Sequence, residues 1–277
     1  MNKRVLRALT KRELFSGVYN LGIYFLIFLS CTMASIFFYS FLDTLEKGIV
    51  TGTPMLTAFI FSVIPVAGLY FGISAVTSIA KERSENTIEV LFYGPISEES
   101  YILSKYINKT ILYCYYLLFT IVFFVISDKF IQFGLGIDFF RLCFLSVLII
   151  SCTVAFGIFL STFFPSENMA IVGLIGFYLF MGMLVILESM FQFPTQGNIT
   201  IIQNLFLKLI QYSRWIDPIH YLSLGISSIR SGGTELLDFK IFELTVDRYL
   251  LSVLESVVYS TAMTVAAIIS LKIKGVK

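Results

Sequence analysis

Six long runs of residues without charge constrain this chain more than any other feature. Five of them contain no Asp, Glu, Lys or Arg at all, and the sixth is interrupted only by Glu255. A helix needs about 20 apolar residues to cross the hydrocarbon core of a bilayer, and each run is close to that length. Charged residues make up 14% of the chain, whereas soluble domains carry about 25%. The sequence therefore predicts an integral membrane protein.

The predicted fold is all-α, a single polytopic membrane domain over residues 1–277. The expected spans cover about 21–42, 56–80, 107–127, 142–163, 169–187 and 250–271. A membrane β-barrel is disfavoured because the runs lack the alternation of period two that barrel strands require.

The basic residues predict how these helices are oriented. Loops rich in Lys and Arg stay on the cytoplasmic side. Twelve basic residues fall on the side of the two chain ends and of the connection between the second and third spans, against three in the short loops opposite. We therefore expect a multi-pass protein of the cell membrane with both termini in the cytoplasm.

Shorter helices are expected outside the spans. Residues 2 to about 16 bring Val5, Leu6 and Leu9 together among basic residues, which favours an amphipathic helix on the inner membrane surface. Between the fifth and sixth spans, "ITIIQNLFLKLIQYSRW" has apolar residues at helical spacing and "DPIHYLSLGISSI" is apolar but short. These two stretches predict one or two outer interfacial or re-entrant helices.

The connection between the second and third spans, "AKERSENTIEVLFYGPISEESYILSK", is densely charged and looks structured. Read as one helix over 81–93, it places Glu82, Glu85 and Glu89 within about 60° of one another, because each residue turns the helix by about 100°. A neighbouring apolar stripe is formed by Ile88, Leu91 and Phe92.

Two signals bound this short helix. Gly94-Pro95 is expected to end it, since proline cannot continue a helix. Ser97 is expected to cap the next helix, which runs into the third span. Spacing alone leaves two interpretations open: a juxtamembrane anchor, or a docking element for a cytoplasmic partner.

The motif in this connection resembles the signature of type-2 ABC transporter permeases. That signature runs acid, basic, two residues, Gly-Thr, Ile or Leu, Glu, any residue and Leu, then a Pro-Ile/Val-Ser turn and a Lys before the third span. The matching positions here are Glu82-Arg83, Thr87-Ile88-Glu89, Leu91, Pro95-Ile96-Ser97 and Lys105. Asn86 stands where the family usually has Gly, and Ser104 stands where a second Gly is common before the Lys.

Other stretches are similar in the same order along the chain. "LTKREL" resembles the basic N-terminal helix of the family, and "STFFPSENMA" resembles its connection between the fourth and fifth spans. "IDPIHYLSLGISSIRSGGTELLDFKIFELT" is similar to the outer segment of the gliding-motility and nitrous-oxide-accessory branch.

The resemblance implies a division of labour between subunits. In such exporters the charged connection is a coupling helix held by a separate ATPase, and two permease halves, identical or paralogous, work with two ATPase copies. The residues that it assigns to ATPase coupling are Glu82, Arg83, Glu85, Thr87, Ile88, Glu89, Leu91, Phe92, Pro95 and Ser97. The chain contains no GxxxxGK[ST] phosphate loop. ATP and Mg²⁺ are therefore expected on the partner, with no cofactor on this chain, which is not itself an enzyme.

Few other residues are candidates for function. Glu255 lies inside a span and Glu188 closes another, and acids within a membrane mark transport pathways by default. The alternative for Glu255 is a pair with Arg248 or a place at the outer interface, and for Glu188 it is the outer interface. His220 is the only histidine, so packing is the better interpretation for it, and no metal site is expected. The net charge of +2 gives no indication of nucleic acid binding, and membrane lipid is the expected surrounding.

Two alternative functions remain at the sequence level. A secondary transporter or channel would need no ATPase, but inverted repeats and several charges in mid-span are expected of that class. A membrane scaffold would transmit the motion of an ATPase without moving a substrate.

Overall fold

The computed structural model describes residues 3–47, 53–93, 96–192, 208–210, 212–213, 216–230, 236–239 and 244–274. The elements, in chain order, are the helices and strands α1 (Lys3–Val18), α2 (Leu21–Glu46), α3 (Pro54–Ser84), α4 (Thr87–Phe92), α5 (Glu98–Ile131), α6 (Ile137–Ser161), α7 (Glu167–Gln192), α9 (Pro218–Arg230), β1 (Leu236–Phe239), β2 (Leu244–Asp247) and α10 (Arg248–Lys274).

The six expected membrane helices are confirmed as α2, α3, α5, α6, α7 and α10, each long and apolar enough to span a bilayer. Each extends beyond the predicted core at one or both ends, because residues outside the hydrocarbon layer can continue a helix. The all-α membrane architecture is therefore the one that the apolar runs predicted. The N-terminal helix expected over 2 to about 16 is present as α1.

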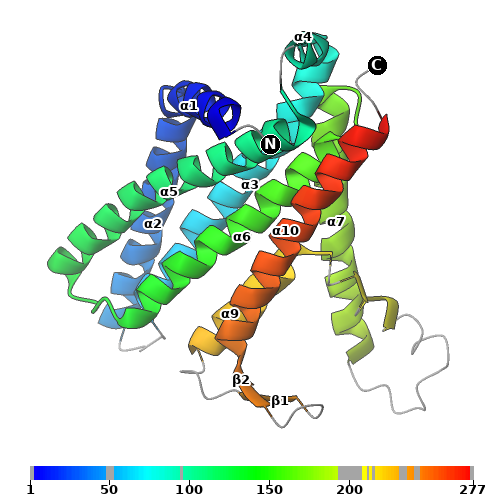
Figure 1. Cartoon of the computed structure of the whole chain (residues 1–277). Coiled ribbons are helices and arrows are strands. Elements are labelled where there is room, and N and C mark those ends of the chain that lie inside the picture. The colour runs from blue at the N-terminus through cyan, green and yellow to red at the C-terminus, as the bar shows by residue number, and fades with distance from the viewer. Residues whose placement is uncertain are drawn as a thin grey trace.

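The termini and the charged connection lie at the same end of the bundle (Figure 1). At that end α1 lies across the bundle beside α5, and α4 and the last turn of α10 lie at the same end. The opposite end carries α9 and the β1–β2 hairpin (Figure 1). We call these the elbow end and the hairpin end.

The core is centred on α6. Of the apolar 18-residue stretch of this helix, 78% is buried within the protein. The helix packs closely against α3 at Gly157. A Cβ atom at Gly157 would lie 2.8 Å from the Ala75 Cβ and 3.2 Å from the Gly72 carbonyl oxygen. The glycine is required because only a residue without a side chain lets the two backbones come so close.

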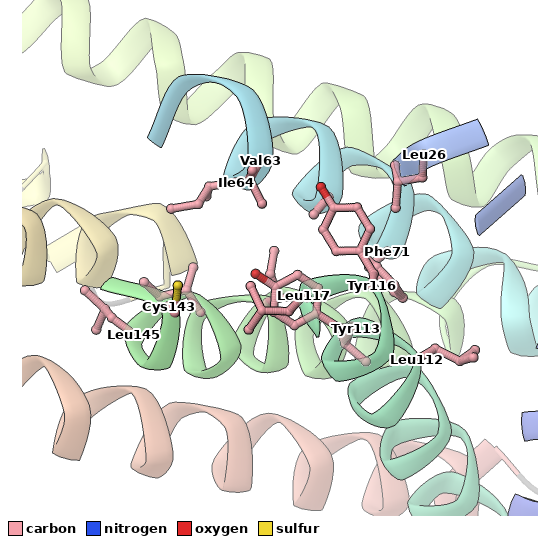
Figure 2. Packing of buried hydrophobic residues seen from close by; sticks show 14 of the residues in the cluster. Leu26, Val63, Ile64, Phe71, Leu112, Tyr113, Tyr116, Leu117, Cys143 and Leu145 are labelled. Carbon is pink, nitrogen blue, oxygen red and sulfur yellow. The ribbon is translucent and has the colours of Figure 1, made fainter. Parts of the chain in front are cut away.

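Aromatic side chains fill the space between α3, α5 and α6. Figure 2 shows Phe71, Tyr113 and Tyr116 among the buried apolar residues of this cluster. The two tyrosine hydroxyls are satisfied inside the core: Tyr113 donates to Ser146 at 2.8 Å, and Tyr116 shares a 2.6 Å hydrogen bond with Ser30. Buried hydroxyl groups need such partners because no water can replace them.

The segment between α7 and α10 differs in part from the prediction. The helix expected from "DPIHYLSLGISSI" is α9, whose N-terminus is capped where Asp217 Oδ1 accepts from the Ile219 amide at 2.9 Å. The preceding stretch, 199–207, lies outside the described residues. Strands β1 and β2 pair antiparallel, with Leu236 opposite Asp247 and Phe239 opposite Leu244, where no strand was expected.

Candidate functional site

The charged connection is built from two helices, where the sequence analysis expected one helix over 81–93. α3 ends at Ser84 and α4 begins at Thr87. Asn86 lies between them with φ of 55°, in the left-handed region where asparagine and glycine are best tolerated. The chain therefore turns sharply at the position where the resembling family usually has glycine.

The start of α5 follows the prediction. Ser97 is its N-cap, and its side chain accepts a hydrogen bond from the Ser100 amide. Glu98 and Glu99 occupy the first turn, where the helix dipole favours negative charge. Gly94 and Pro95 lie outside the described residues, as does the side chain of Glu89.

Lys105 ties three helices together behind this connection. Its side chain is only 9% exposed, and its Nζ pairs with Glu82 of α3 and, at 2.8 Å, with Glu13 Oε1 of α1. Tyr101 of α5 donates a hydrogen bond to Glu82 Oε2 at 2.5 Å. A lysine this buried is stable only because both carboxylates compensate its charge. The arrangement fixes the end of α3 against α1 and α5.

Arg83 joins the same end of α3 to α6. Its guanidinium donates to the carbonyl oxygens of Thr162 and Phe164, at 3.1 and 3.4 Å. These carbonyls lie just past the C-terminus of α6, where the helix itself supplies no donors. Beside them, Ser161 Oγ accepts from the backbone amides of Ile79 and Ala80.

The apolar stripe of α4 faces the protein. Ile88 is 5% exposed, and Leu91 and Phe92 are half-buried against the core cluster. The Phe92 ring meets the Tyr101 ring edge to face, with 5.6 Å between the centroids. These contacts fix α4 to α5, so the stripe packs at least partly within the chain.

A different set of side chains points outward. Glu85, Asn86 and Thr87 are exposed, and the Tyr93 side chain is 88% exposed. We call these four residues the elbow face. The acids expected on one stripe are thus divided: Glu82 turns inward to Lys105, whereas Glu85 remains exposed. Tyr93 was missed by the sequence analysis, although a tyrosine beside Gly-Pro in a charged connection is a usable signal for an exposed aromatic residue.

A polar cavity of about 520 Å³ lies beneath the connection, between α1, α3 and α5. Its charged lining residues are Arg12, Glu13, Lys81, Glu82, Glu85, Lys105, Lys109 and Glu167. Acids and bases are balanced in this set. A cavity of this volume has room for water molecules beside the charged side chains.

The other candidate residues lie away from the connection. Glu255 is half-buried in α10, seven residues after the helix begins at the hairpin end. Glu188 belongs to the C-terminal part of α7, and its side chain lies outside the described residues. His220 is half-buried in the first turn of α9. Within the described residues no three His, Cys, Asp or Glu side chains gather as a metal site would require.

These features define a multi-pass membrane protein whose charged connection is fixed to its helical core. Comparison with known families assigns the class more closely: residues 9–272 match the ABC-2 family transporter protein family. The chain therefore belongs to this family and is an ABC transporter permease. A search of curated proteins finds no match.

Proposed function

We propose that this chain is the transmembrane subunit of an ATP-driven exporter, powered by separate ATPase subunits that hold the elbow face. Two copies of the chain, or one copy and a paralogue, form the pathway, and the elbow end faces the cytoplasm. The likeness of its outer segment supports a place in the gliding-motility and nitrous-oxide-accessory branch.

The observation that carries this proposal is that the elbow face is exposed while the end of α3 behind it is bonded to neighbouring helices. The elbow face carries an exposed acid, Glu85, and an exposed aromatic residue, Tyr93. Tyrosine is among the residues that contribute most to binding at protein interfaces. Behind this face, Glu82 joins α3 to Lys105 of α5, which also pairs with Glu13 of α1. Arg83 joins α3 to the end of α6. A force applied to the elbow face therefore moves whole helices and is not absorbed locally.

The need for a partner motor follows from the sequence. None of the 277 residues belongs to a GxxxxGK[ST] phosphate loop, so ATP and Mg²⁺ are assigned to the ATPase. When two ATPases close on ATP, the rigid connection transmits a domain movement that opens and closes the pathway.

A second permease copy is supported by the exposed apolar helices. In α7 only 17% of the apolar 18-residue stretch is buried within the chain, and in α2 the buried share is 28%. Lipid covers part of these faces, and a partner permease packed on one of them completes the pathway.

Glu255 and Glu188 are proposed to line the pathway. Both acids lie in membrane helices, where an ionisable side chain is costly unless it serves a function. Transport by a Glu255→Gln variant at the wild-type rate in vesicles would exclude the first of them.

The proposal is tested with a tagged chain and the ATPase that co-purifies with it. In the Glu85→Ala/Tyr93→Ala variant we expect at least tenfold weaker association, because interface tyrosines often contribute 2 kcal/mol or more. Lys129→Ala is the matched control, since Lys129 is exposed at the other end of α5. ATP-independent transport, with no ATPase bound to the unaltered chain, would favour a secondary transporter or channel.

A further inference from the structure

Helix α1 has two distinct long faces. One faces the polar cavity with Leu9, Arg12, Glu13, Ser16 and Gly17. The other borders an open groove of about 650 Å³ between α1 and Ile107 of α5. This volume lies within the roughly 300–1,000 Å³ of sites that bind small molecules.

The groove is apolar along its floor and basic at one end. Its floor is formed by four residues of α1 spaced four apart, Leu6, Thr10, Leu14 and Val18, and by Ile107 of α5. A parallel ridge, also at a spacing of four, runs Arg7, Lys11, Phe15, Tyr19. Basic side chains therefore precede exposed aromatic ones along a single edge.

The charge on the two faces of α1 is separated. The single acid of the helix, Glu13, turns away from the groove and pairs with Lys105 and Asn108. No acidic side chain lines the groove among the described residues. Lys11 is exposed, with its Nζ 6.0 Å from the centre of the Phe15 ring. The groove thus offers uncompensated positive charge next to an apolar surface.

We propose that this groove is a binding site for one anionic phospholipid of the inner leaflet. The phosphate pairs with Arg7 and Lys11, and an acyl chain lies along Leu14, Val18 and Ile107. Phe15 and Tyr19 flank the boundary between headgroup and chain, where aromatic side chains are favoured. The proposal rests on the membrane setting of α1 and does not depend on an ATPase partner.

A lipid fits these observations better than a protein segment. A lipid supplies the two required properties, a negative head and a continuous apolar tail, in the same order as the basic and apolar parts of the groove. The cytoplasmic leaflet is rich in anionic lipid and attracts basic side chains close to the membrane.

The test measures lipid retention by native mass spectrometry of the full chain. The probes are phosphatidylglycerol, phosphatidylcholine with the same acyl chains, and glycerol phosphate without chains. We expect one saturable site for phosphatidylglycerol and none for glycerol phosphate. In Arg7→Gln/Lys11→Gln the affinity should fall about 25-fold, since each basic residue near an anionic surface contributes about fivefold.

Two further variants separate a defined site from diffuse attraction. Arg12→Gln removes a charge from the other face of α1 and should leave the saturable site within about twofold. Phe15→Ser alters the groove without changing charge and should weaken binding of phosphatidylglycerol. The single variant Arg7→Gln should lose about fivefold. Equal losses in Arg7→Gln and Arg12→Gln, or equal binding of the two phospholipids, would overturn the proposal. So would a photo-crosslink from position 15 in whole cells that yields a protein adduct and no lipid adduct.

Discussion

At the scale of single residues, the structure of the charged connection depends on a few side chains. Their roles differ in how far the sequence predicts them. The N-cap role of Ser97 is local, so the sequence predicts it. The turn at Asn86 breaks a stretch whose apolar residues fit a continuous helix, so a periodicity argument misses it. The pairing of Lys105 with Glu13 joins residues 92 positions apart, and no single sequence without its fold indicates such a contact.

Lys105→Met should destabilise the chain by about 2 kcal/mol. Removing one partner of a buried ion pair costs about 3–5 kcal/mol, and the quarter exposure of the two glutamates reduces that figure. The measurement is the free energy of unfolding in mixed detergent micelles. The triple variant with Glu13→Gln and Glu82→Gln should recover most of the loss, because no carboxylate then lacks its partner. A triple variant no more stable than Lys105→Met would contradict this account.

Asn86→Ala should cost about 1–2 kcal/mol, whereas Asn86→Gly should be nearly neutral. The reason is the left-handed backbone at this position, which penalises a residue with a Cβ atom and no side-chain amide. Thermal unfolding of the two variants in the same detergent provides the comparison. Equal midpoints for alanine and glycine would mean that the turn does not restrict the residue.

At the scale of helices and strands, length and hydropathy were sufficient for the membrane spans. Six runs of adequate length allow few other structures, so α2, α3, α5, α6, α7 and α10 were predicted within several residues. The β1–β2 hairpin was missed because each strand has only four residues and no Asn-Gly or Asp-Gly turn marks it. The contact of α3 with α6 was not predictable, since the predicted spans of these two helices are apolar on all sides.

Gly157→Ala should destabilise the α3–α6 contact by about 2 kcal/mol. The new methyl group would lie 2.8 Å from the Ala75 Cβ, and overpacking of this kind costs about 1–3 kcal/mol. Gly176→Ala in α7 is the matched control, because a Cβ there has no neighbour within 4 Å. Unfolding free energies should therefore separate the two substitutions, and an equal effect would argue against a close helix contact at Gly157.

At the scale of the whole molecule, the arrangement agrees with a protein whose proposed ATPase contacts are concentrated at one end of the helix bundle. The chain ends and the charged connection gather at the elbow end (Figure 1), as an even number of spans requires. The distribution of basic residues predicts that this end is cytoplasmic. The proposed assembly with an ATPase and a second permease depends on surfaces whose partners one sequence does not specify.

Crosslinking of the elbow face tests the central claim most directly. Tyr93→Cys, introduced after the four native cysteines are replaced, is treated with a short bifunctional maleimide reagent in intact cells. We predict an adduct between one permease chain and one ATPase subunit, and protection of Cys at position 93 from a membrane-impermeant maleimide added outside. Labelling of that cysteine from outside, with no ATPase adduct, would contradict the account.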